Sequence, residues 1–169
     1  MKAVLIIVTV FFSLLANGQN ATESILKGNK LYQQSQFDLA EAEYRKALEY
    51  EPNNEKAKYN LANALQKQSK YDDAIKLLDD LAGNSRDHSI KAAAYYNQGV
   101  AYTKVKDLDA SIESYKKALR LNPGDKEARE NLEKALLQKK NQRSQQKKSQ
   151  SSMSQKEAQQ KLDMLNQKE

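Results

Sequence analysis

The stretch from Gly28 to Pro52, GNKLYQQSQFDLAEAEYRKALEYEP, decides the fold because its pattern of small, aromatic and turn-forming residues recurs along the chain. Residues 99–123, GVAYTKVKDLDASIESYKKALRLNP, repeat it with identical internal spacing, and a looser middle copy contains Ala62 at the first glycine position. The first two copies are offset by 34 residues and the last two by 37. A period of this length is typical of stacked helical hairpins. The functional question is therefore which partner binds, rather than which reaction is catalysed.

Each copy contains two stretches in which apolar residues recur every three or four positions, which is the period of a helix. In the first copy these stretches are residues 23–34 and 37–50. Gly28 and Ala40 are small where two helices must approach closely, and Tyr44 is expected to fill the space between successive hairpins. The sequence predicts an all-α fold without β-strands. Its three hairpins are expected over about residues 21–54, 55–88 and 92–125.

Proline marks the ends of two hairpins. Pro52 and Pro123 end the second helix of the first and third copies, because the proline ring cannot continue a helix. The middle copy instead reads LAGNSRDHS over residues 81–89 and contains the three additional residues of the longer offset. We expect a longer loop there, with Gly83 in a left-handed cap. A final helix over residues 125–138 has an apolar face and no matching second helix, so we expect it to cap the array.

The repeated Gly28, Ala40, Tyr44, Ala47 and Pro52 resemble the tetratricopeptide repeat (TPR), over roughly residues 21–137. The resemblance implies a right-handed superhelix of helix-turn-helix hairpins. In that family, the first helices of the hairpins line a concave groove that grips an extended peptide or a partner helix. The middle copy departs from the pattern by its missing proline, and the third copy by a serine in place of one alanine.

Twelve residues are placed on this groove when the family pattern is carried over by position. Tyrosine offers a large apolar face with a polar tip, and asparagine can bond a peptide backbone as donor and as acceptor. A given tyrosine can also pack inside the array, and both arrangements stay open. The expected groove residues are Asn29, Tyr32, Gln33, Lys56, Tyr59, Asn60, Asn63, Lys67, Tyr96, Asn97, Val100 and Lys104.

One version of the family binds the acidic C-termini of chaperones through two asparagines and three cations. Asn29 and Asn60 match the two asparagines. The residues that stand at the three cation positions are Ile25, Ala93 and Asn97. The resemblance therefore implies that this chain does not have that specificity.

A second resemblance is to the exported repeat protein of Bacteroides aerotolerance (Bat) operons. It is carried by residues 27–32 (KGNKLY), residues 59–65 (YNLANAL), the extended second loop and the tail with KLDML at residues 161–165. That family is encoded with membrane proteins bearing von Willebrand A-type domains. The resemblance implies a scaffold in a stress-related periplasmic complex, with such an envelope protein as a candidate partner.

Residues 1–18 have the features of a signal peptide. Lys2 supplies the positive flank, residues 3–15 are almost entirely apolar, and Ala16-Asn17-Gly18 offers small residues where signal peptidase cleaves. The apolar run is shorter than the roughly 20 residues that span a bilayer. We expect cleavage after Gly18 and export to the periplasm or cell envelope of a bacterium, and an uncleaved anchor is the alternative. The chain has no cysteine, which excludes a disulfide and a lipoprotein anchor.

Charge is distributed unevenly along the chain, whose formal net charge is +6. Residues 139–169 hold eight basic and three acidic side chains, whereas residues 19–138 hold 19 of each sign. A nucleic-acid-binding protein carries its basic surface on the folded domain, so the neutral repeats argue against that partner. Residues 138–150 contain no apolar side chain, and we expect residues 139–169 to form a disordered or weakly helical tail.

The tail leaves several roles open. It can act as a solvated spacer, or contact an anionic membrane surface or an acidic partner. Ala158, Leu162 and Leu165 lie at helical spacing, so its end is either a short amphipathic docking helix or a frayed polar segment.

Residues for catalysis are sparse. His88 is the only histidine, in the expected loop, and no glycine-rich phosphate loop is present. The acidic pairs 72–73 and 107/109 fall at expected helix starts, where carboxylates satisfy free backbone N–H groups. The pair 79–80 lies near a helix end, where a carboxylate has no such role. We expect a protein that is not an enzyme and uses no metal, cofactor or small-molecule substrate.

Two classes of function follow from the sequence. The first is an exported, non-catalytic scaffold or adaptor whose groove docks one envelope protein. The second is a periplasmic holdase-like chaperone or assembly factor that binds many unfolded clients. A single stoichiometric partner supports the first, and many substoichiometric clients support the second.

Overall fold

The structure is a computed structural model that describes residues 19–166, so the expected signal peptide lies outside the described residues. The described residues are all-helical, in agreement with the predicted fold class. A first helix covers residues 19–33. The helices that follow are α2 (Phe37–Tyr50), α3 (Glu55–Lys67), α4 (Tyr71–Asn84), α5 (His88–Lys104), α6 (Leu108–Leu121) and α7 (Lys126–Asn166).

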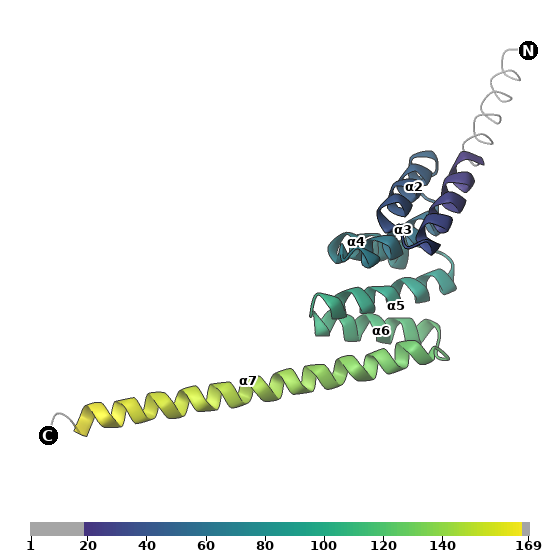
Figure 1. The fold of residues 1–169 in the computed structure, drawn as a ribbon. Coiled ribbons are helices and arrows are strands. Elements are labelled where there is room, and N and C mark those ends of the chain that lie inside the picture. The colour runs from purple at the N-terminus through teal and green to yellow at the C-terminus, as the bar shows by residue number, and fades with distance from the viewer. Residues whose placement is uncertain (1–18, 167–169) are drawn as a thin grey trace, which may run out of the picture.

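The helices stack in chain order, from the helix over residues 19–33 at one end to α7 at the other (Figure 1). From α2 onward, neighbouring helices along the chain pack against each other, and α3 and α5 also touch, as do α5 and α7. The 19–33 helix contacts α2 through Gly28 and Tyr44 and α3 through Asn29 and Asn60. The first helices of successive hairpins therefore adjoin along one side of the array. The three predicted hairpins are the 19–33 helix with α2, α3 with α4, and α5 with α6.

Each hairpin turns through the same backbone motif. One residue in each turn has a positive φ: Ser35 at 59°, Ser69 at 60° and Lys106 at 64°. The next residue donates its N–H to a carbonyl oxygen in the last turn of the preceding helix. In the first hairpin, Gln36 N donates to Leu31 O at 3.0 Å. This is the Schellman arrangement, in which a left-handed residue reverses the chain and satisfies free carbonyls at the helix end. Its repetition gives all three hairpins the same entry into their second helix.

A tyrosine ring packed on a glycine sets the spacing within the first and third hairpins. A Cβ added to Gly28 would lie 2.6 Å from Tyr44 Cε1, and one added to Gly99 would lie 2.6 Å from Tyr115 Cδ1. Tyr44 also belongs to the core cluster that contains Leu61 of α3. The ring thus packs within its own hairpin as well as against the next one, which is more than the sequence predicted.

The linkers after α2 and α6 lie where the sequence predicted that these helices end. Each contains the predicted proline in a turn and ends on a capping side chain. Asn54 Oδ1 accepts a 2.9 Å hydrogen bond from Ala57 N, and Asp125 Oδ1 accepts one of the same length from Ala128 N. Such caps satisfy backbone donors that the first turn of a helix leaves free.

The prediction of a longer loop over residues 81–89 is wrong. Helix α4 continues to Asn84 and α5 begins at His88, so residues 85–87 form a short connection. Asp87 caps α5 by accepting from Ser89 N at 2.7 Å, and the buried Ser85 hydroxyl accepts from Asp87 N at 3.1 Å. Gly83 is helical and does not have a positive φ. The additional residues extend α5, which has 17 residues compared with 13 in α3.

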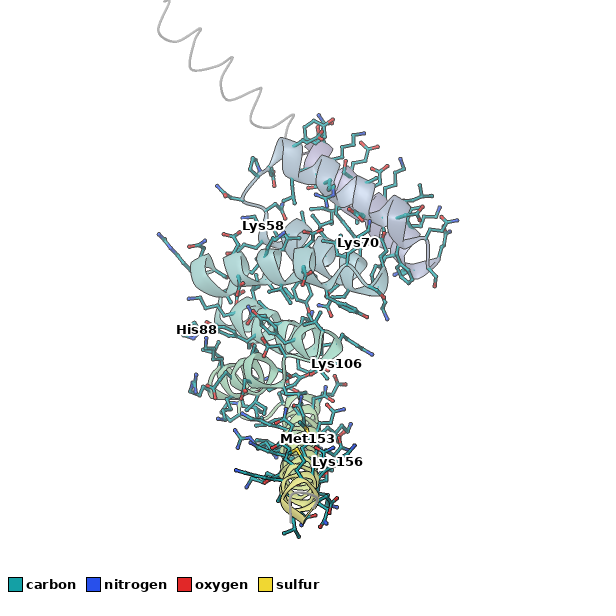
Figure 2. All side chains as sticks on the ribbon, turned by 90° about the vertical axis from the view of Figure 1, so that its left-hand side faces the viewer. Lys58, Lys70, His88, Lys106, Met153 and Lys156 are labelled. Atoms are coloured by element: carbon teal, nitrogen blue, oxygen red, sulfur yellow. The ribbon has the colours of Figure 1, made fainter. Side chains whose placement is uncertain are left out.

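The tail is helical, and the domain boundary predicted at residue 138 is not a break in structure. Helix α7 runs without interruption through 41 residues. No glycine or proline follows Gly124, and the Gln, Lys and Arg residues of this segment favour helix. Beyond the other helices α7 projects as a single rod (Figure 1). Figure 2 looks along this rod, where the side chains near Met153 and Lys156 radiate into solvent.

Substituting Gly99 with alanine should destabilise the array by about 1–3 kcal/mol, because the added methyl group forces the Tyr115 ring to move. The matched control is Gly83→Ala, where an added Cβ meets nothing within 4 Å. That change should stabilise by roughly 0.5–1 kcal/mol, because alanine loses less backbone entropy in a helix. Urea unfolding followed by circular dichroism measures both effects. Equal midpoints for the two variants would contradict the packing constraint.

Candidate peptide-binding groove

A hollow of about 190 Å³ opens on the side of the array formed by the first helices of the first two hairpins. Five of its six lining residues are among the groove residues expected from the sequence, and Tyr44 is the addition. The lining residues are Asn29, Tyr32, Gln33, Tyr44, Asn60 and Asn63. The structure thus brings together residues from three helices on one concave surface.

The floor of this hollow is organised by the side chain of Asn29. Its Oδ1 accepts a 2.9 Å hydrogen bond from the Tyr44 hydroxyl and a 2.8 Å hydrogen bond from Asn60 Nδ2. Tyr44 is only 2% exposed, so its ring belongs to the core while its hydroxyl reaches the hollow. The sequence identified Tyr44 as a packing residue and did not assign this second role.

The same bond recurs between the second and third hairpins. Asn97 Nδ2 donates to Asn63 Oδ1 at 2.7 Å, and Gln66 Nε2 donates to the Asn97 carbonyl oxygen at 3.3 Å. Asn29 and Asn63 occupy equivalent positions of successive first helices, as do Asn60 and Asn97. A ladder of asparagine amides therefore joins the three first helices along the groove.

Helix α7 changes the ladder at its third step, where Val100 replaces the accepting asparagine. Asn131 Nδ2 donates instead to the Tyr96 hydroxyl at 3.2 Å, and that hydroxyl donates to Glu127 Oε2 at 3.2 Å. Tyr96 and Val100 pack against the core cluster around Tyr115. These two expected groove residues are thus partly covered by α7. The 34-residue interval from Asn97 to Asn131 is the sequence signal that would have identified this closure.

By their burial, six of the expected groove residues divide into packed and exposed ones. Tyr32 and Tyr59 are partly buried against the core, and the rings of Tyr32 and Phe37 meet edge to face with centroids 5.2 Å apart. Four others are exposed and lie at or next to the ends of the first helices. These are Gln33, Lys56, Lys67 and Lys104.

Two tyrosines of this side have strongly raised pKa values. Burial, with a smaller contribution from Tyr32, raises the pKa of Tyr44 to about 12. Burial and the adjacent Glu127 carboxylate raise the pKa of Tyr96 to about 12. Both phenols therefore stay protonated near neutral pH and act as hydrogen-bond donors.

Members of the pairs 107/109 and 79–80 make structural contacts, whereas the start of α4, where the pair 72–73 lies, has no side-chain cap bond. Asp107 accepts from Ala110 N at 3.0 Å and caps α6, as expected. Asp79 accepts from Gln98 of α5, and Asp80 pairs with Lys58 of α3. The Lys58 ammonium lowers the pKa of the Asp80 carboxyl. The pair at residues 79–80, to which the sequence assigned no role, thus links neighbouring helices.

The described residues offer little for other kinds of site. Over residues 19–166, no group of three or more acidic or histidine side chains is placed to hold a metal ion. In the same residues, no helix combines the length and the apolar composition of a membrane span. His88 is the first residue of α5, exposed to solvent, rather than part of a loop (Figure 2).

Comparison with known proteins identifies the class to which this array belongs. Residues 31–96 and residues 92–125 match two family models that both describe the tetratricopeptide repeat. The chain therefore carries tetratricopeptide repeats over residues 31–125, and its fold is a tetratricopeptide superhelix.

Individual relatives include an Hsp70-Hsp90 organising protein and a repeat domain bound to an HSP90 peptide. The chain is 34% identical over 101 residues to the Hsp70-Hsp90 organising protein of Plasmodium falciparum (isolate 3D7), and the match spans 57% of this chain but only 18% of that protein. The first TPR of Spaghetti (RPAP3) bound to the HSP90 peptide SRMEEVD aligns with a TM-score of 0.66 and 27% identity, covering 71% of this chain and 93% of that one. The TPR2AB domain of yeast Sti1 in its pHSP90 complex aligns with a TM-score of 0.69 and 29% identity, covering 76% of this chain and 50% of that one.

The Tyr44 phenol should make the free energy of unfolding sensitive to alkaline pH. The folded chain holds the Tyr44 proton more tightly than the unfolded chain, because the pKa rises from 10.0 to about 12 on folding. The tighter hold on this proton adds to the free energy of unfolding below pH 10, and that addition is lost as the pH rises toward 12. Tyr44→Phe should cost about 1 kcal/mol at neutral pH through the lost hydrogen bond, and should lose less stability than wild type at alkaline pH.

Urea unfolding over this pH range, with ultraviolet titration of the phenolates, measures the effect. The matched control is Tyr71→Phe, because the Tyr71 hydroxyl contacts the exposed Ser69. If Tyr44→Phe and wild type lost stability in parallel, Tyr44 would not be the titrating group.

Proposed function

We propose that this protein is an exported, non-catalytic adaptor that binds an extended segment of another protein in the hollow between its first two hairpins. The observation that carries the proposal is the pair of amides facing this hollow. Within the described residues, Asn29 Nδ2 and Asn60 Oδ1 have no hydrogen-bond partner, although the opposite atoms of both amides are bonded to each other. One donor and one acceptor are therefore available to a carbonyl and an N–H of a peptide backbone.

The surroundings of the two amides suit an extended segment. The partly buried Tyr32 gives the hollow an apolar wall, and Gln33 and Asn63 add polar groups on either side. The fixed Asn29–Asn60 bond orders both amides before a ligand arrives, which reduces the entropy lost on binding. The match to tetratricopeptide repeats supports a protein partner, because the solved relatives include complexes with peptides.

The acidic chaperone peptide is a poor candidate for this groove. Of the three positions where the family's chaperone-binding version has cations, Ile25 is buried, Ala93 is a small apolar residue and Asn97 is bonded to Asn63. A carboxylate-rich peptide would find no cation at these positions to offset its desolvation.

The peptide SRMEEVD, which is bound by the solved relative, should show no saturable binding to this protein in isothermal titration calorimetry. The relative's own domain serves as the positive control under identical buffer and salt conditions. Micromolar affinity for this chain would show that the groove retains the chaperone specificity despite the missing cations.

The cell-envelope location and the Bat-type complex are also part of the proposal. The signal-peptide features of residues 1–18 support export with cleavage after Gly18, and an anchor that is retained is the alternative. The resemblance to the exported Bat-operon protein supports an envelope partner, for example a membrane protein with a von Willebrand A-type domain.

Filling the hollow should weaken partner binding without loss of a core contact. Gln33 is exposed and lines the hollow, so Gln33→Trp places a large ring over Asn29 and Asn60. Gln34→Trp is the matched control, because Gln34 is an exposed neighbour that does not line the hollow. Each variant is expressed in its native host, crosslinked in the cell envelope and purified, and the bound proteins are quantified by mass spectrometry.

We expect one stoichiometric partner with wild type and Gln34→Trp, and a loss of at least about tenfold with Gln33→Trp, which corresponds to roughly 1.4 kcal/mol. Equal recovery from both variants would exclude the hollow as the binding site. Many substoichiometric proteins, together with suppression of client aggregation, would favour the holdase-like chaperone over the scaffold.

A further inference from the structure

Helix α7 repeats the first-helix pattern of the third hairpin. A shift of 34 residues aligns Ala94 with Ala128 and Ala101 with Ala135, and all four are buried. The same shift aligns Asn97 with Asn131, and both donate a hydrogen bond to the preceding first helix. The start of α7 therefore occupies the position of the first helix of a fourth hairpin.

The second helix of that hairpin is missing from the described residues, because α7 continues straight to Asn166. In the third hairpin, α6 covers the end of α5, where the Thr103 hydroxyl lies 2.6 Å from the Ser111 hydroxyl. The 34-residue shift aligns Tyr102 and Thr103 with Leu136 and Leu137. These leucines are 46% and 59% exposed, so apolar side chains replace polar ones at a position that no described helix covers.

An open notch lies beside these leucines, where α7 passes the start of α6. It has a volume of about 430 Å³, and Ile112 and Leu136 supply its apolar surface. Side chains from one face of each helix complete it. The lining residues are Asp109, Ile112, Glu113, Lys116, Leu136, Lys139, Lys140, Arg143, Ser144 and Lys147.

The notch has unbalanced positive charge. Its two carboxylates are already paired, Asp109 with Lys139 and Glu113 with Lys116. Lys140, Arg143 and Lys147 follow at helical spacing on one face of α7, and none of them forms an ion pair within the described residues. An incoming segment would therefore meet an apolar floor with three free cations along one side.

We propose that an amphipathic, acidic helix of a partner protein docks in this notch and against Leu137, as the second helix of a fourth hairpin completed in trans. A helix suits the site because α3 and α5 pack against the second helices of their own hairpins, and the 19–33 helix packs against Tyr44 of α2. Acidic residues on the partner would pair with the three free cations. The chain's own tail is basic, with Lys156 and Lys161 in it, so neither this tail nor that of a second copy suits the notch. A flat bilayer surface cannot fill a concave site.

A labelled peptide based on α6 tests the proposal in the full-length mature chain. The acidic probe has the sequence LDASIESYKKALRL with glutamate in place of Lys116, Lys117 and Arg120, and the unchanged basic sequence is the comparison peptide. Fluorescence anisotropy should show saturable binding of the acidic probe and binding at least about tenfold weaker for the basic one. Lack of saturable binding by the acidic probe would overturn the proposal.

Two charge-reversal variants with the same change in net charge locate the binding site. Changing Lys140, Arg143 and Lys147 to glutamate should weaken probe binding about tenfold, whereas the matched triple in Lys148, Lys156 and Lys161 should change it less than about twofold. Leu136→Gln with Leu137→Gln should also weaken it. Equal effects of the two triples would show attraction by overall charge and overturn the proposal.

Two further measurements distinguish helix docking in the notch from binding in the groove and from binding to a membrane. The Gln33→Trp variant should bind the acidic probe like wild type, so failure of the groove proposal and failure of the notch proposal are distinguishable. Vesicles of phosphatidylglycerol and phosphatidylcholine in equal parts provide the membrane comparison. Vesicle binding that depends on Lys140, Arg143 and Lys147, with no probe binding, would assign the notch to a lipid surface instead.

Discussion

The close packing of a tyrosine ring on a glycine is the constraint on which the rest of this array depends. In the first and third hairpins the ring occupies the place that a Cβ would need, so the two helices can adopt this spacing only if one of them lacks a side chain. The middle hairpin has Ala62 and Leu78 at the equivalent positions, both fully buried. Leucine is smaller than tyrosine, so Leu78 leaves room for the methyl group of Ala62. In each hairpin, the side chain on the second helix is therefore matched in size to the residue that it faces on the first helix.

This packing also links the core to the groove. Because Gly28 allows the Tyr44 ring to lie against its own first helix, the hydroxyl emerges beside Asn29 in the hollow. Asn29 is thereby held from within its hairpin by Tyr44 and from the next hairpin by Asn60. The amide geometry of the hollow is thus a consequence of core packing rather than of the surface residues alone.

The repeat pattern predicted the hairpins well because size and spacing are local properties of a helix. It placed the second helix of the first hairpin at residues 37–50, which are the bounds of α2. The family pattern, carried over by position, named five of the six residues that line the hollow. It failed where the outcome depends on competing contacts. The composition of residues 81–89 suggested a loop, but the cap at Asp87 and the buried Ser85 make a shorter connection more favourable. The partial covering of Tyr96 depends on where α7 packs, which the spacing of the first three copies does not specify.

Because α7 is uninterrupted, its length determines how far its C-terminal end lies from the repeats. A helix rises about 1.5 Å per residue, so the part beyond Lys140 extends roughly 40 Å. The neutral repeats stand at one end of this rod, and its basic side chains are distributed along it. The length of α7 therefore sets the distance between its far end and the hollow at the first two hairpins. The number of residues in α7 is thus the scale of this separation.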